Sequence, residues 1–250
     1  MDLDHVDKAI VASYRKLRTR IGIVSIAFPL VLLAIGYLWG IEVQPTMSNY
    51  YFAKDTIVGR VDLYPVRLWF CGMLFIVGFF LYKYQGFSKN EDRWLSLAGT
   101  FAACVAIFPM SVDGKSDYDF IMAWLHLTQF SLHGIFAVLA FACIAVVIVW
   151  YADSTLSELK SLHPGEYKWF KRAYFVIALF MVAAIGIAVV LHYLHHEQGS
   201  YILAAEWVGI WSFAAYWFVK NSEMTKVGKV LKARNRTLRS RTEADLADKL

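Results

Sequence analysis

The feature that most constrains this chain is a series of six apolar stretches, each about as long as a helix that crosses a lipid bilayer. A transmembrane helix needs about 20 mostly apolar residues to cross a hydrocarbon core roughly 30 Å thick. The stretches cover residues 21–40, 66–82, 94–110, 122–151, 173–194 and 201–219. They lack the polar and apolar alternation of a barrel strand, so the sequence predicts an all-α polytopic membrane protein with six transmembrane helices in one bundle.

The composition favours the same class. Hydrophobic residues make up 58% of the chain and the mean hydropathy is +0.47, whereas a soluble domain is closer to half apolar. A basic amphipathic segment, residues 1–20, precedes the first stretch, and a basic tail, residues 220–250, follows the last. We therefore expect a six-helix domain at residues 21–219 with a short cytoplasmic segment on either side, and no soluble catalytic domain.

Positive charge predicts how the chain is oriented, because cytoplasmic loops retain Lys and Arg. With six crossings, 25 Lys and Arg residues are divided so that all but four fall on one side; the exceptions are Lys54, Arg60, Arg67 and Lys115. We therefore expect both termini in the cytoplasm. The net charge of +5 then reflects topology, and the basic termini are expected to bind anionic lipid at the cytoplasmic face, with no role in binding nucleic acid.

Small residues in the third stretch predict close helix packing. Ala98, Ala102 and Ala106 recur at every fourth position, with Gly99 and Ala103 beside them. This pattern lets two helix backbones approach closely inside a membrane. We expect the third helix to be central.

Polar and ionisable residues inside the apolar stretches mark the candidate site, because such groups are rare at membrane depth and usually face a cavity or a partner. They are His126, Gln129 and His133 in the fourth stretch, His192, His195 and His196 around the end of the fifth, and Glu206 near the start of the sixth. The first three have the i, i+3, i+7 spacing of one helix face. With six crossings, all seven converge in the outer third of the bundle.

His133 and Glu206 stand out because both have apolar neighbours on either side. Leaving either one charged and unpaired would cost several kcal/mol. One interpretation is that they hydrogen-bond each other as a structural tie between helices, and the other is that they line a functional pocket. His195 and His196 lie in a short outer loop, where solvation alone accounts for them.

Five segments carry a resemblance to a known family. They are PTMSNYY, VRLWFCGMLF, LAGTFAACVAIFP, HGIFAVLAF and AAEWVGIWSFAAYWFVKN. In their order and spacing they resemble the DRAM/FRAG/SFK group of six-helix membrane proteins and its uncharacterised bacterial relatives, over about residues 21–221. The matching polar residues are Ser48, Arg67, His133 and Glu206. Ser96 stands where an Asn is expected, and His126 with the His192 to His196 group departs from the pattern.

The resemblance implies a bacterial cytoplasmic membrane or a eukaryotic endomembrane, and its eukaryotic members are linked to lipid-anchor remodelling, autophagy and lipid organisation. The favoured interpretation is a pocket that binds or organises a lipid or amphiphile, capped by residues 41–64. Arg67 would attract a phosphate, and His133 with Glu206 would make the pocket sensitive to protonation. The predicted ligand-binding residues are Ser48, Tyr50, Arg67, His126, Gln129, His133 and Glu206.

The alternative is an intramembrane, metal-dependent hydrolase of a lipid, or of an amide or ester bond. Zinc would take His133, Glu206 and one of His126 or His192, leaving a position for water, and Ser48 would orient or attack an acyl carbonyl. On one helix His126 and His133 would lie about 10 Å apart, so a metal would need ligands from several helices.

Two further functions are disfavoured. A two-haem ladder needs histidines near both leaflets, and a transporter of the inverted-repeat type needs internal repeats, which the sequence lacks. A homo-oligomer is compatible with the sequence.

Overall fold

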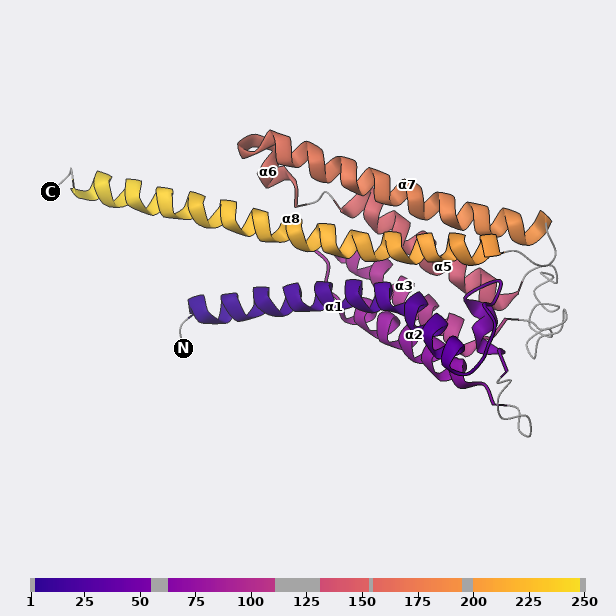
Figure 1. Cartoon of the computed structure of the whole chain (residues 1–250). Helices are drawn as coiled ribbons and strands as arrows, with labels where there is room; N and C mark the ends of the chain where they lie inside the picture. Colours follow the sequence, from indigo (N-terminus) through magenta and orange to yellow (C-terminus); the bar gives the residue numbers. More distant parts are fainter. Residues whose placement is uncertain (1–2, 55–62, 111–130, 153–154, 195–199, 248–250) are drawn as a thin grey trace.

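The computed structural model describes residues 3–54, 63–110, 131–152, 155–194 and 200–247, and their regular structure is helical. The elements are α1 (Leu3–Leu38), η1 (Ser48–Tyr51), α2 (Pro65–Lys83), α3 (Lys89–Ile107), α5 (Leu132–Val146), the π-helical η2 (Val147–Tyr151), α6 (Ser157–Leu162), α7 (Pro164–Leu194) and α8 (Ser200–Ala247). The long helices form one bundle, and the N-terminal part of α1 and the C-terminal part of α8 project from the same end (Figure 1). The predicted all-α class is confirmed.

Five described helical segments are long and apolar enough to cross a membrane. They are Ala9–Leu38, Pro65–Lys83, Leu132–Tyr151, Pro164–Leu191 and Tyr201–Asn235. The outward face of α7 has the apolar surface expected of a helix in lipid. Four large apolar side chains on it are more than half exposed: Phe175, Leu179, Phe180 and Ile187. A contiguous apolar surface of this kind suits contact with lipid and is unusual on a soluble monomer. The chain therefore has the architecture of a polytopic membrane protein.

Among the long helices that the structure describes, α3 has a shorter apolar part than the five that are long and apolar enough to cross a membrane. It packs against α2 and α5. Its first turn carries the acidic residues Glu91 and Asp92, and the side chain of Ser88 caps it by accepting a hydrogen bond from the Glu91 N–H. Because charged residues occupy this first turn, the apolar part of α3 is shorter than that of its neighbours.

The start of α5 corrects the predicted span at 122–151. Ser131 is extended and caps the helix, because its hydroxyl accepts a hydrogen bond from the Gly134 N–H. The helix therefore begins at Leu132, and His133 lies in its first turn rather than two turns along a longer helix. The helix face predicted to hold His126, Gln129 and His133 stays a prediction, because His126 and Gln129 lie outside the described residues.

Two helices run past the boundaries that composition indicates. α1 is continuous from Leu3 to Leu38, through the basic segment and the first apolar stretch. α8 is continuous from Ser200 to Ala247, through the last stretch and most of the basic tail. Burial also continues past residue 219, because Lys220, Glu223 and Val227 are buried.

Close packing of α2 and α3 confirms the prediction from small residues. A Cβ added to Gly99 would lie 2.4 Å from the Gly78 carbonyl oxygen, and one added to Gly78 would lie 2.7 Å from the Gly99 carbonyl oxygen. Both are backbone contacts too short for any side chain. Ala98, Ala102 and Ala106 are buried around this crossing.

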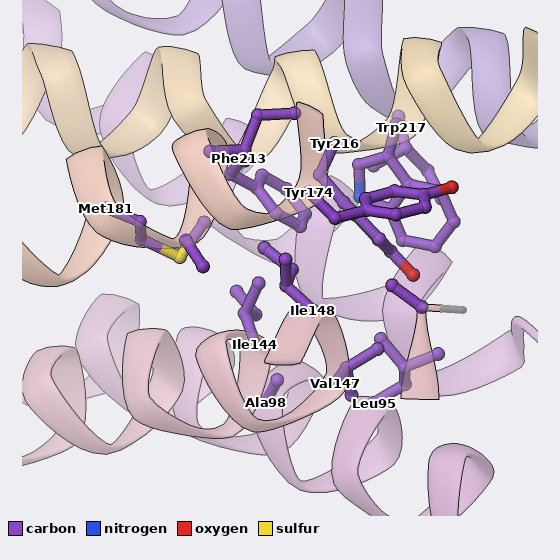
Figure 2. Packing of buried hydrophobic residues seen from close by; sticks show 14 of the residues in the cluster. Leu95, Ala98, Ile144, Val147, Ile148, Tyr174, Met181, Phe213, Tyr216 and Trp217 are labelled. Carbon is purple, nitrogen blue, oxygen red and sulfur yellow. The ribbon is translucent and has the colours of Figure 1, made fainter. Parts of the chain in front are cut away.

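Buried side chains form two clusters along the bundle. One includes Leu95, Ala98, Ile144, Val147, Met181, Tyr216 and Trp217 and joins α3, α5, α7 and α8 (Figure 2). The other includes Phe28, Leu32, Tyr50, Phe70 and Leu203. The second cluster lies at the end where α1 finishes and α2, α5 and α8 begin, which we call the η1 end. We call the opposite end, from which α1 and α8 project, the terminal end.

Candidate functional site

A partly open cavity of about 120 Å³ lies among α1, α2, α3, α5 and α8. On α5 it is lined by His133, Ala137, Ala140 and Ile144, which lie on successive turns. These positions extend over about 16 Å of helix. Three polar side chains, from Ser48, His133 and Glu206, line the η1 end. Beyond them the lining is apolar except for Ser25, whose hydroxyl donates to the Ile21 carbonyl at 2.8 Å.

Ser48 and His133 form a hydrogen-bonded pair at the η1 end. The distance from Ser48 Oγ to His133 Nε2 is 2.7 Å, and His133 Nδ1 lies 2.9 Å from the Phe108 carbonyl oxygen. A carbonyl oxygen only accepts hydrogen bonds, so Nδ1 carries a proton. In the neutral imidazole Nε2 is then unprotonated and accepts the Ser48 hydroxyl proton. The serine hydroxyl therefore donates to a base whose orientation is fixed.

The imidazole is held from several sides. Its side chain is 6% exposed, and its ring stacks on that of Phe70, with centroids 6.3 Å apart and an interplanar angle of 24°. Phe108, which supplies the carbonyl, is the C-cap residue of α3. Contributions from η1, α2, α3 and α5 therefore meet at this one side chain.

Glu206 ties the start of α8 to the segment that precedes η1. Its Oε2 accepts a hydrogen bond from the Met47 N–H at 2.6 Å, and the Leu203 N–H donates to the Pro45 carbonyl at 3.0 Å. The interpretation that Glu206 and His133 pair with each other is wrong. Each has its own partners, and the two meet only as lining of the same cavity.

Arg67 and Tyr50, both predicted to bind ligand, lie beside the cavity and do not line it. Arg67 Nε donates to the Tyr51 carbonyl at 3.0 Å, and its guanidinium lies 4.4 Å and 4.1 Å from the ring centroids of Tyr51 and Tyr64. Tyr50 is 1% exposed and packs against Gly36. Burial raises the pKa of the Tyr50 phenol, which therefore stays neutral. Both residues fasten η1 to the helices.

The other predicted site residues fall largely outside the described residues. His126, Gln129, His195 and His196 lie there, and His192 belongs to α7 but its side chain is not described. Within the part of the chain that the structure describes, no group of three His, Cys, Asp or Glu side chains is placed to hold a metal. Both ring nitrogens of His133 are engaged by Ser48 and Phe108. The zinc site therefore stays a prediction, and the described residues do not bring a set of zinc ligands together.

A second polar cluster, at the terminal end, was not predicted from the sequence. Lys220 and Glu223 are fully buried and form an ion pair at 3.2 Å. Lys220 Nζ also donates to the Ala152 carbonyl at 2.7 Å, at the end of η2, and to Thr155 Oγ1 at 3.1 Å. The hydroxyls of Thr155 and Tyr174 donate to the Glu223 carboxylate. We call these residues the Lys220 network.

Neighbouring side chains extend the polar cluster across the bundle. Arg18 donates to the Tyr84 hydroxyl and to Asn221 Oδ1, both at 3.3 Å, which joins α1 to α8. Glu91, which precedes the apolar part of α3, is fully buried and accepts a hydrogen bond from the Phe87 N–H at 2.8 Å. Desolvation by burial raises the pKa of Glu91. The sequence signal for this cluster was that apolar residues continue at helical spacing after Lys220, among them the buried Val227.

The fold and site together define a class: a polytopic helical membrane protein with a cavity that is polar at one end. Comparison with protein-family models, curated proteins and solved structures found no match to the chain. The cavity and the side chains at its η1 end are therefore what bears on function.

Proposed function

We propose that this protein crosses a membrane six times, with both termini in the cytoplasm, and binds a lipid or similar amphiphile in the cavity between its helices. The sixth crossing would be α3, which lies within the bundle beside α2 and α5. The shared end of the projecting parts of α1 and α8 supports an even number of crossings (Figure 1). Arg15, Lys16 and Arg20 line a groove at that end, which favours contact with anionic lipid at the cytoplasmic face.

The observation that carries the proposal is the division of the cavity into a polar end and an apolar length. Ser48, His133 and Glu206 supply the polar end, and apolar side chains follow over about 16 Å. An amphiphile has the same division. The volume of about 120 Å³ is close to that of an engineered apolar cavity of ~150 Å³ that holds benzene. So small a volume over that length suits one unbranched acyl chain better than a fused ring system.

The family resemblance adds support. Three of its four matching polar residues, Ser48, His133 and Glu206, line the cavity together. A group whose members are linked to lipid organisation would be expected to gather its shared polar residues where a lipid binds. The fourth, Arg67, holds η1 through the Tyr51 carbonyl.

Lipid analysis of cavity-filling variants tests this function. Ala140 lines the cavity and is 7% exposed, so Ala140→Leu places a larger side chain where the chain would lie. Val138 lies on the same helix but is 40% exposed, so Val138→Leu is a matched control on the outer face. We expect mass spectrometry of detergent-purified protein to find near-stoichiometric lipid in wild type and Val138→Leu, and much less in Ala140→Leu. Equal lipid in all three proteins would overturn the proposal.

Protease protection tests the orientation. The tail should be cleaved in inside-out vesicles and protected in right-side-out vesicles, because we place the terminal end in the cytoplasm. The opposite pattern would reverse the proposed topology.

A further inference from the structure

We propose that Ser48 and His133 form a nucleophile–base pair that hydrolyses a carboxylic ester of the amphiphile in the cavity. This inference rests on the proposed function, since the cavity must hold the acyl chain of the ester. It needs no metal ion, because the base is the imidazole itself. A nucleophile within hydrogen-bond reach of a base that is oriented by a third group is the arrangement that activates a serine. Here the third group is the Phe108 carbonyl.

The hydrogen bonding of Ser48 differs from that of Ser25, the other serine that lines the cavity. Ser25, which also lines the cavity, donates to a backbone carbonyl one helical turn earlier, as helical serines commonly do. Thr100 does the same toward Ser96. Ser48 instead donates to His133, which is 85 residues later in the chain, and the bond joins η1 to α5. A hydroxyl that satisfies only its own helix has no base, whereas Ser48 has one at 2.7 Å.

The cavity could hold an ester substrate with its carboxyl group beside Ser48 and His133. An acyl chain lying against Ala137 and Ala140 would bring its carboxyl carbon to the η1 end, beside Ser48. Ser48 is half-buried, and the proposed reaction takes its water from that end. The polar end thus joins a nucleophile, a base and a route for the second reactant.

The reaction has two balanced steps. In the first, Ser48 Oγ bonds to the carboxyl carbon, its proton passes to His133 Nε2, the ester C–O bond breaks, and His133 gives the proton to the departing alcohol. In the second, water attacks the acyl-serine, His133 takes a proton from the water and returns it to Ser48 Oγ, and a carboxylic acid leaves. No oxidant, reductant or cofactor is consumed.

Glu206 acts as a positioning residue in this scheme. Its carboxylate holds the N–H of Met47, the residue immediately before Ser48, and so fixes the start of η1 relative to α8. Glu206→Gln keeps an acceptor oxygen and should leave the Ser48 to His133 distance intact. Glu206→Leu removes the acceptor and should lower kcat without moving the pH at which the base titrates.

A fluorophosphonate probe tests the pair directly, because it bonds to serines that are activated by a base. With full-length protein in detergent, we expect one adduct, located on Ser48 by peptide mass spectrometry. Labelling should vanish in Ser48→Ala and slow by at least about 100-fold in His133→Gln, the lower range for loss of a general base. Ser212→Ala changes a buried serine of α8 that does not line the cavity, and this variant should label like wild type. The rate should rise with pH as the imidazole loses its proton.

The outcomes separate this inference from the proposed function. If wild type carries lipid that Ala140→Leu lacks, but Ser48 is never labelled, binding stands and hydrolysis is overturned. If Ser48 is labelled but lipid content is the same in Ala140→Leu, the nucleophile stands and the binding proposal fails. Labelling of Ser48 that is indifferent to His133→Gln and to pH would also overturn the pair. Retained lipid and an unchanged melting temperature in Ser48→Ala show that the variant is folded.

Discussion

Replacing Lys220 by Met should be among the most destabilising single changes in this protein. Lys220 and Glu223 are both 0% exposed, and Lys220 donates three hydrogen bonds. Methionine would leave the Glu223 carboxylate buried without its cation and the Ala152 carbonyl without its donor. Breaking a buried ion pair by removing one partner costs about 3–5 kcal/mol. We expect a loss of that size in the free energy of unfolding.

The chain supplies a matched control on the same helix. Lys226 pairs with Glu166 at 2.7 Å, a shorter distance than in the Lys220 pair, but the two side chains are 44% and 40% exposed. Exposed pairs contribute about 0–1 kcal/mol, because water already solvates both charges. Lys226→Met should therefore cost much less than Lys220→Met, although its ion pair is closer.

Unfolding by SDS in mixed micelles, followed by tryptophan fluorescence, measures both free energies. The double variant Lys220→Met with Glu223→Gln should be less destabilised than the sum of its single changes, because the stranded negative charge is gone. A cost for Lys220→Met no greater than that for Lys226→Met would refute the reasoning that burial, rather than distance, decides the effect.

Three further changes test other parts of the structure. Gly99→Ala should lower the unfolding free energy by about 1–3 kcal/mol, because its Cβ would meet a facing backbone carbonyl at 2.4 Å, whereas Gly72→Ala, with nothing within 4 Å, should be neutral or stabilising in the same SDS titration. Glu91→Gln should become more stable relative to wild type as the pH rises. Burial raises the pKa of Glu91 in the folded protein above its ordinary 4.5. Wild type is therefore most stable below pH 4.5, and it loses stability as the pH rises through the raised pKa. Melting temperatures measured from pH 4 upward check this, and a constant difference contradicts it. Glu206→Leu should cost about 1–3 kcal/mol by leaving a buried N–H without its acceptor, and Glu206→Gln much less, as thermal unfolding would show.

The helical class and most helix positions could be predicted because a membrane imposes a minimum length on apolar stretches. Helix ends could not, because they depend on local hydrogen bonds. Ser131 lies inside the stretch predicted as one span, and only its cap with the Gly134 N–H shows that α5 begins after it. At the other extreme, α8 continues to Ala247, where composition indicates a change to a basic tail.

The candidate site was predictable as a set of residues but not as a set of contacts. His133 and Glu206 stood out from their apolar neighbours, and Ser48 came from the resemblance. Their hydrogen bonds depend on the chain folding back between α1 and α2, which places η1 over the starts of α5 and α8. The Lys220 network was missed because a charge just after an apolar stretch is normally cytoplasmic. Burial of Lys220 depends on tertiary packing against η2 and α7.

The two polar clusters are connected mechanically through α8. Glu206 and Glu223 lie on one continuous helix, 17 residues or about 25 Å apart. The Lys220 network fixes the rotation and height of that helix at the terminal end, and a slip of one residue would turn Glu206 by about 100°. The Lys220 network is thus an anchor for α8 at the terminal end, while the hydrogen bonds from the Met47 N–H to Glu206 and from the Leu203 N–H to Pro45 hold the same helix at the η1 end. A folded variant that has lost the anchor should lose the alignment of Ser48 with His133 before the apolar wall of the cavity changes.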